Sequence, residues 1–251
     1  MIVENVLRDS RYINTNKKLF LEKTSGVRKV VSPNLRPFAF IHNLKEEALS
    51  VKHNSPHFFF YENTKGIHFK SLQSMYAGGV IGEYNTGNVE IFGHDERSPN
   101  VKSAFEKVIH FQVNSNNDML LNIRGGMLGS KMTQFNIYNK TYNTQTFSYF
   151  DDFDKFPRLN ENPIYNNSMI DEDKNTIGSF TDSKIHLHAI SSGDNIDRQH
   201  DTTEGNYTYT PNRISDSIPQ RQSKEIELNN GVNISMRIAG NTTIAVGQLI
   251  N

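Results

Sequence analysis

One aromatic-rich segment dominates the sequence: Pro56-His57-Phe58-Phe59-Phe60-Tyr61-Glu62-Asn63-Thr64-Lys65-Gly66-Ile67-His68-Phe69-Lys70-Ser71-Leu72. It contains two short runs of residues that favour a pleated strand, and a polar turn with Gly66 joins them. This pattern predicts a β-hairpin over residues 57–72.

A helix is predicted directly before the hairpin. Its apolar residues recur every three to four positions, which places them on one face: Phe38, Ile41, Leu44, Ala48 and Leu49. Pro37 suits the first turn, where a missing N–H costs nothing, and Ser32 or Asn34 can cap the helix. We expect this face to pack against the core and to carry no chemistry.

Apolar runs on either side of this unit predict further elements. Three strands are expected in the N-terminal part, at residues 2–7, 18–22 and 27–31. After the hairpin we expect a loop-rich region, a short helix and a strand, at residues 76–99, 98–107 and 108–113.

A second informative segment begins at Asn116. Asn116 or Asn117 can cap a short helix, whose apolar residues we expect to face inward: Met119, Leu120, Ile123 and Met127. Gly125 and Gly126 weaken the end of this helix by roughly 1 kcal/mol each relative to alanine, or allow close backbone packing. Residues 132–149 then predict strands, with a turn near 139–140 or 143–144.

The remainder of the chain alternates irregular and strand-like segments. Residues 151–180 are acidic and rich in asparagine, which predicts a linker or a long surface loop. We expect, in chain order, a strand at 185–190, irregular chain at 191–218, a short helix or strand at 223–228, and two strands around a turn at 232–238 and 243–250.

Composition excludes several classes of protein. The 251 residues balance 27 basic against 27 acidic side chains, so no net charge points to nucleic acid. There is no cysteine, which excludes disulfides and thiolate metal sites. No apolar run approaches the roughly 18 residues of a membrane span, and the N-terminus lacks the pattern of a signal peptide. We therefore expect a soluble chain without a membrane anchor.

Three polar clusters are candidates for chemistry. His186 and His188 flank one leucine, so both would point to one face of a strand and could bind a metal, or simply face solvent. Asp151, Asp152 and Asp154 lack the spacing of a calcium loop. The third cluster is Gly93-His94-Asp95-Glu96, a base with two carboxylates in a glycine-rich loop. A hydrolase that uses His94 and Asp95 is therefore a minor alternative hypothesis.

The aromatic cluster Phe58-Phe59-Phe60-Tyr61 has two readings. Aromatic side chains stack on sugars and bases, so the cluster could form a binding platform. No basic residues interleave it, however, and an aromatic strand buried on both faces explains the pattern better. We expect no catalytic residue, no metal ligand and no cofactor-binding residue.

Two motif blocks resemble the baseplate hub proteins of T4-like and other contractile-tailed phages. The first block consists of Pro37-Phe38, Phe59-Phe60-Tyr61-Glu62, Lys65-Gly66-Ile67-His68-Phe69 and Ser71-Leu72. The second is Asp118-x-Leu120-x-Asn122-Ile123-x-x-Gly126-Met127-x-x-Ser130-Lys131, followed by Asn136-Ile137, Lys140 and Tyr142. A third and more generic match lies at Gly240–Ile250. The motif positions are expected to be structural: Pro37, Phe38, Phe59, Phe60, Tyr61, Glu62, Gly66, Phe69, Ser71, Leu72, Asp118, Asn122, Gly126, Ser130 and Lys131.

The resemblance implies a fold and a set of partners. Hub proteins of this kind are similar to tail-tube proteins, so the expected fold is α+β and mainly β, with tail-tube-like antiparallel β-barrel domains that each carry a helix, plus a loop-rich insertion. The family forms a homotrimer whose ring joins the central spike protein to the tail tube or its initiator proteins. DNA passes through the lumen without specific binding. The expected location is the tail baseplate of the virion, assembled in the host cytoplasm.

The resemblance also divides the chain. We expect part of a tube-like barrel domain at 1–106, a helix and strands completing a second tube-like domain at 107–150, a loop-rich insertion or small accessory domain at 151–220, and a strand pair returning to a barrel at 221–251. The family's long N-terminal segment has no counterpart here, and the chain ends inside an expected strand. A fragment, a divergent short form or a truncated reading frame is therefore expected.

The sequence thus predicts a structural, non-enzymatic hub subunit that acts through protein–protein surfaces. A carbohydrate-binding or adhesin-like β module is the alternative, because of the aromatic cluster and the asparagine-rich loops.

Overall fold

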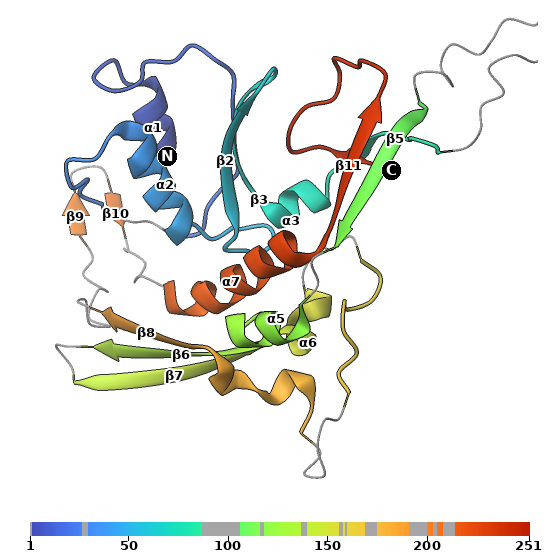
Figure 1. Ribbon diagram of the computed structural model, residues 1–251. Coiled ribbons are helices and arrows are strands. Elements are labelled where there is room, and N and C mark those ends of the chain that lie inside the picture. The colour runs from blue at the N-terminus through green and yellow to red at the C-terminus, as the bar shows by residue number, and fades with distance from the viewer. Residues whose placement is uncertain are drawn as a thin grey trace, which may run out of the picture.

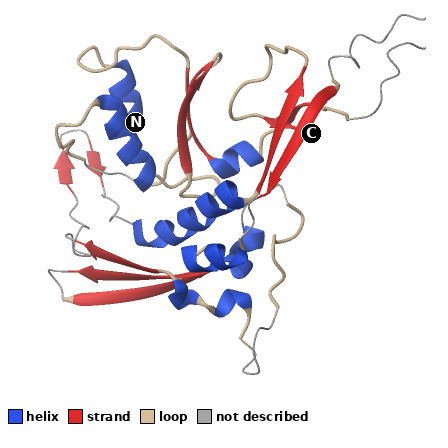
Figure 2. Cartoon of the chain, viewed as in Figure 1, coloured by secondary structure: helices blue, strands red, loops and turns tan. Residues whose placement is uncertain are grey.

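The computed structural model combines several small sheets with helices, which makes the chain an α+β protein (Figures 1 and 2). The structure describes residues 2–26, 30–86, 106–115, 118–136, 140–155, 158, 160–168, 175–190, 200–202, 205–207 and 214–251. The sheets within these ranges have two or three strands each, and none of them closes into a barrel.

The predicted hairpin is confirmed as β2 (Phe58–Asn63) and β3 (Gly66–Ser71). The two strands pair antiparallel, and β1 (Leu19–Leu21) adds to β3 in parallel, giving the order β1-β3-β2. The predicted helix before the hairpin is also confirmed, as α2 (Pro37–Glu47) with a proline in its first turn. Its N-cap is Arg36, which makes no side-chain capping bond, so the prediction of a Ser32 or Asn34 cap was wrong.

The N-terminal segment was wrongly predicted as a strand, because it forms helix α1 (Ile2–Arg8). Its buried residues Val3, Val6 and Leu7 are spaced for one face of a helix. That face packs with α2 on one side of the sheet, and the shared core includes Phe40, Ile41, Phe58, Ile67 and Phe69. A short apolar run fits either type of element, and the contact with α2 favours the helix here.

A second sheet lies below the first in Figure 1. It consists of β6 (Gly129–Asn136), β7 (Thr141–Ser148) and β8 (Ile185–Ile190), in the order β7-β6-β8. The strands predicted over 132–149 and the strand predicted at 185–190 are thereby confirmed; β7 pairs antiparallel with β6, and β8 pairs in parallel with it. Lys140 lies between the two strands as predicted, whereas the alternative turn at 143–144 was wrong because these residues belong to β7; residues 137–139 lie outside the described ranges.

Short helices close one end of this sheet. They are α5 (Met119–Gly125), α6 (Tyr149–Asp152) and three 3₁₀ turns, η1 (Phe153–Lys155), η2 (Ile177–Ser179) and η3 (Thr181–Ser183). Phe153 and Ile177 are buried in a second core with Met127, Leu128, Phe147 and Tyr149. The prediction of only linker or surface loop over 151–180 was therefore wrong for these residues, because their apolar side chains pack under the sheet.

Helix α7 (Ile214–Asn230) runs between the two sheets (Figure 1). Arg221 forms an ion pair of 2.8 Å with Glu46 of α2. Two residues along the helix, the Ser223 hydroxyl donates to the Met127 carbonyl at 2.6 Å. The helix thus connects both cores. The helix is far longer than the short helix or strand predicted at 223–228. The prediction missed its length because polar side chains make these contacts, and a search for apolar periodicity does not detect them.

The remaining strands form two-stranded sheets. Strand β5 (Val108–Ser115) pairs antiparallel with β11 (Val232–Ile238), and β4 (Val80–Gly82) pairs in parallel with β12 (Leu249–Ile250). Strands β9 (His200–Thr202) and β10 (Gly205–Tyr207) pair with each other, and α3 (Leu72–Tyr76) follows the hairpin.

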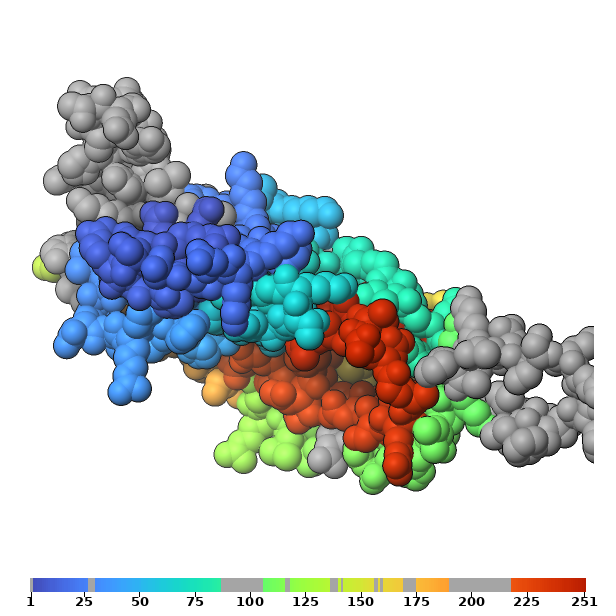
Figure 3. Space-filling view, turned by 90° about the horizontal axis from the view of Figure 1, so that it is seen from above, coloured from blue at the N-terminus to red at the C-terminus, as the bar shows by residue number. Residues whose placement is uncertain are grey.

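The C-terminal prediction was correct only for its first strand. Residues 243–250 do not form a strand beside β11; they make turns that lead into β12 at Leu249. Seen from above, this C-terminal segment (red) lies against the segment that holds the hairpin and α3 (cyan) (Figure 3). The side-chain amide of Asn63 donates a hydrogen bond of 3.2 Å to the Val246 carbonyl, which links the two segments. The helix predicted at 98–107 falls almost wholly outside the described residues.

Gly126 offers a direct test of the local structure. It ends α5 in the left-handed region at φ 85°, and a Cβ there would lie 2.7 Å from the Cβ of Lys184. We expect Gly126→Ala to lower the free energy of unfolding by roughly 1–2 kcal/mol, measured by urea denaturation. Gly79→Ala is the matched control, because a Cβ at Gly79 meets no atom within 4 Å. Equal stability of the two variants would contradict the assigned cap.

Candidate functional site

The predicted histidine pair lies on strand β8. His186 and His188 lie half-buried on the inner side of β8, which faces α7, and the pKa of His186 is lowered by burial and by the nearby cations Lys184 and Arg221. The alternative prediction, that both imidazoles lie on the solvent side of the strand, was wrong, because Ile185 and Leu187 occupy that side. Within the described ranges no three acidic or histidine side chains gather where they could hold a metal.

Two carboxylates of the acidic cluster at 151–154 are paired with cations. Asp152 pairs with Lys155 at 2.5 Å and Asp154 with Arg158 at 2.7 Å, so these carboxylates serve as local ion pairs. The segment Gly93–Glu96 lies outside the described residues.

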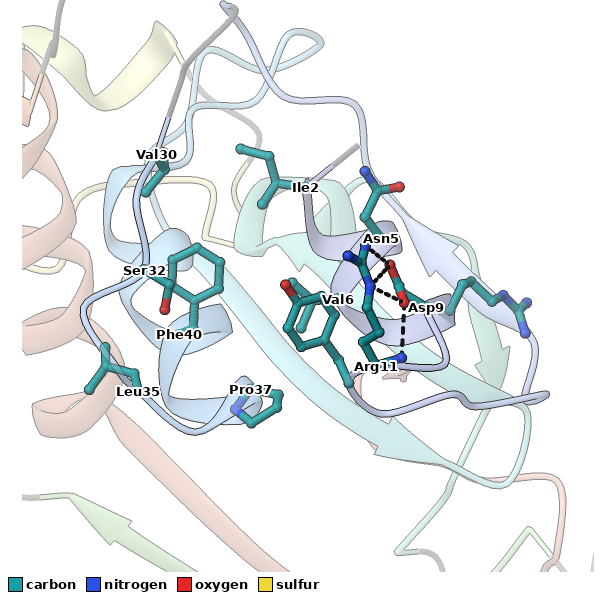
Figure 4. Close-up of a pocket in the computed structure, with 12 residues that line it drawn as sticks. Ile2, Asn5, Val6, Asp9, Arg11, Val30, Ser32, Leu35, Pro37 and Phe40 are labelled. Carbon is teal, nitrogen blue, oxygen red and sulfur yellow. Dashed lines mark hydrogen bonds and ion pairs between the residues drawn. The ribbon is translucent and has the colours of Figure 1, made fainter.

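A pocket of about 720 Å³ lies between α1, the segment 30–37 and α2 (Figure 4). Its charged groups are already used within the chain: Arg11 pairs with Asp9 at 2.7 Å, and Arg8 donates to the Thr15 carbonyl at 2.7 Å. The hydrogen bond from Arg11 lowers the pKa of Asp9 to about 2. A carboxylate held in this way is a poor general base, so the pocket offers no catalytic group of that kind.

Each ring of the aromatic cluster Phe58–Tyr61 packs against an aromatic ring outside the cluster: Phe58 on Phe69, Phe59 on His57, Phe60 on Phe38 and Tyr61 on His68. The His68 ring lies between Phe20, at a centroid distance of 4.5 Å, and Tyr61, at 4.9 Å, with interplanar angles of 7° and 2°. Lys18 covers the Phe20 ring with its ammonium 5.0 Å from the centroid. A platform for sugars or bases needs an open ring face. The rings of Phe20 and Tyr61 cover both faces of the His68 ring. The arrangement gives no support to the carbohydrate-binding alternative.

The first motif block determines the hairpin and its ends. Gly66 turns the chain between β2 and β3 at φ 143°, and Phe69 and Leu72 are buried. Ser71 caps α3, and both its backbone N–H and its hydroxyl donate to the carboxylate of Glu22. The other positions of the block are the helix-start residue Pro37, the exposed Phe38, the half-buried Phe59, Phe60 and Tyr61, and the exposed Glu62, which pairs with Lys17.

The second motif block has a similar structural character. Asp118 caps α5 by accepting from the Leu121 N–H at 3.1 Å, so the predicted caps, Asn116 and Asn117, which lie outside the described residues, are not needed. Asn122 is buried and bonds to Tyr165 and to Asn230 of α7 at 2.8 and 2.6 Å. The remaining positions are Gly126 at the C-cap, the buried Ser130, and Lys131, which pairs with Asp182 at 3.1 Å.

Among the described residues, two groups of exposed apolar side chains each share one face of a sheet, and the first lies on the β5–β11 ribbon. Register pairs Phe111 with Met236 and Val113 with Ile234, while Val232 opposes Ser115. Residues opposite each other share one face of a sheet, so these five apolar side chains form one surface, which we call the ribbon face. They are between 37% and 65% exposed. The reverse side of the ribbon carries His110, Gln112, Asn114, Asn233, Ser235 and Arg237.

The second surface is the side of the β7-β6-β8 sheet turned away from α7. Phe135 aligns with Tyr142 on β7 and with Ala189 on β8, which places it on the same side as Ile185 and Leu187. We call Phe135, Tyr142, Ile185 and Leu187 the outer face; they are between 42% and 79% exposed. Leu120, predicted to face inward, is also exposed, because α5 turns Met119 and Ile123 to the core instead.

Sequence analysis identified these strands but missed the two apolar faces. The alternation Phe111-x-Val113 and Val232-x-Ile234-x-Met236 is a visible pattern, yet it is the same for a face buried within a chain and a face buried between chains.

Comparison with protein-family models, with curated proteins and with solved structures finds no match in any of the three. Among the described helices, none has the length and apolar character needed to cross a bilayer.

Proposed function

We propose that this chain is a structural, non-enzymatic subunit of a contractile phage tail, where it forms a ring in the baseplate hub between the central spike and the tail tube. The two motif blocks support the family assignment. The observation that carries the structural role is the ribbon face, an apolar sheet surface that the fold of a single chain leaves in contact with solvent.

The physical argument concerns the stability of a ribbon. Two strands alone are at best marginally stable in water, and their outer edges leave backbone N–H and C=O groups unpaired. Strands β5 and β11 gain a covered apolar face if a neighbouring subunit lies against them. In the proposed ring, tail-tube-like barrels are therefore completed between subunits. Repetition of one contact around a closed ring then gives a finite oligomer and not a fibre.

The proposed partners follow from the ring. A homotrimer binds the spike protein on one side and tail-tube or tube-initiator proteins on the other. Its lumen passes DNA, and a chain of zero net charge has no excess of cations to retain the phosphates through salt-dependent contacts. The proposed location is the tail baseplate of the virion, with assembly in the host cytoplasm.

The solution mass tests this proposal. We expect light scattering of the purified chain to give a trimer at micromolar concentration, and negative-stain electron microscopy to show rings with an open lumen. A chain that stays monomeric at the highest soluble concentration would contradict the proposed function.

A further inference from the structure

Both uncovered apolar surfaces are of the kind that mark protein interfaces. Monomeric soluble proteins rarely expose contiguous apolar patches above a few hundred Å². Five side chains of the ribbon face, each about half exposed, present on the order of 400 Å². The four more exposed side chains of the outer face present a similar area, again on the order of 400 Å².

The two surfaces cannot cover each other within one chain. The ribbon lies at the upper right in Figure 1 and the β7-β6-β8 sheet at the lower left, with α7 between them. The outer face is also turned away from α7, since the buried Ser130 and Met132 occupy the opposite side of β6. Each surface therefore needs a separate occupant.

We propose that the occupant is a second copy of this chain, with the ribbon face of one copy packed on the outer face of the next. Both surfaces are sheet faces whose apolar side chains recur every second residue, and such faces bury each other by stacking at about 10 Å, as in a β-sandwich. The partner is of the same composition, and 27 basic against 27 acidic residues leave no net repulsion between copies.

The area agrees with a specific contact. The named side chains alone would bury roughly 800 Å² in total, and a polar rim would bring the contact toward the roughly 1,200–2,000 Å² of a stable interface. Because the two surfaces differ, the contact is heterologous, and each copy uses both of its surfaces once. This step rests on the proposed function, since a ring requires such a head-to-tail contact.

Two variants that introduce a charge test the contribution of each surface to self-association. Ile234→Asp places a carboxylate on the ribbon face and Leu187→Asp places one on the outer face, and each should weaken self-association by roughly 30-fold or more. Both positions are exposed in the single chain, so the variants should keep the far-ultraviolet circular dichroism of the parent. Ser235→Asp, on the polar side of the ribbon, and Asn143→Asp, an exposed position on the opposite side of the sheet from the outer face, are the matched controls. Val113→Asp and Ile185→Asp serve as second variants of each surface.

Mixing the variants decides which surface meets which. Ile234→Asp retains an intact outer face and Leu187→Asp an intact ribbon face, so an equimolar mixture should form a dimer although each alone is monomeric. Sedimentation velocity would measure this. If the parent assembles but the mixture stays monomeric, the ribbon-to-outer-face pairing is wrong while the ring proposal stands. Undiminished assembly of either single variant would likewise overturn the pairing, and a monomeric parent would overturn the ring itself.

Discussion

Phe69→Ala should lower the free energy of unfolding by about 3–5 kcal/mol. Phe69 is 1% exposed in the core that α1 and α2 form with the β1-β3-β2 sheet, and its ring stacks on Phe58 with the centroids 4.9 Å apart. Alanine would leave a cavity between the sheet and the helices α1 and α2, because the central strand β3 is fixed by a neighbour on each side. Urea denaturation followed by circular dichroism would measure the loss.

Phe38→Ala is the matched control for this experiment. Phe38 belongs to the same motif block, but it is 56% exposed on α2, and its ring lies 5.9 Å from the half-buried ring of Phe60. We expect its replacement to cost less than about 1 kcal/mol. Similar losses in the two variants would mean that α2 packs with a different face toward the sheet.

This contrast illustrates how far the sequence could predict the fold. The hairpin and α2 follow from local patterns: alternation and a glycine turn for one, a repeat of three to four residues and Pro37 for the other. The strands β6, β7 and β8 were predictable for the same reason. Helix α1 was not, since a six-residue apolar run fits either a strand or a helix until its packing partner is known.

Long-range contacts explain the larger omissions. Helix α7 has few apolar residues and a proline at position 219, so its length depends on polar links such as Arg221–Glu46 and Asn230–Asn122. Strand β5 finds β11 more than a hundred residues later in the chain. Local sequence patterns predict neither the contacts of α7 nor the pairing of β5 with β11. The candidate interface depends on both elements. The pairing of β5 with β11 creates the ribbon face, and α7 determines which side of the β7-β6-β8 sheet is covered.

His57 should make the protein sensitive to acid. Its side chain is 4% exposed, and burial lowers its pKa from 6.5 to about 4. The cations Lys45 on α2 and Arg221 and Lys224 on α7 act in the same direction, whereas the carboxylate of Glu225, 3.9 Å from the ring, opposes them. The folded state therefore holds His57 neutral at pH values where the unfolded chain already binds a proton.

The sign of the effect follows from proton linkage. Between pH 6.5 and 4 the unfolded state binds more protons at this position, so stability falls as the pH falls through that window and is fully present above it. A shift from 6.5 to about 4 corresponds to about 3 kcal/mol between pH 7 and pH 4. His57→Gln removes the titrating group, so the stability difference between the parent and this variant should change by that amount across the window.

Denaturant unfolding at pH 7, 5.5 and 4 would measure the effect for both proteins. The comparison isolates His57, because His68 and His186 also have lowered pKa values and remain in the variant. Parallel stability curves for the two proteins would contradict a buried neutral His57 and, with it, the close packing of α7 against the start of β2. Convergence of the two curves toward acid pH would show that protonation of His57 contributes to the acid sensitivity of the fold.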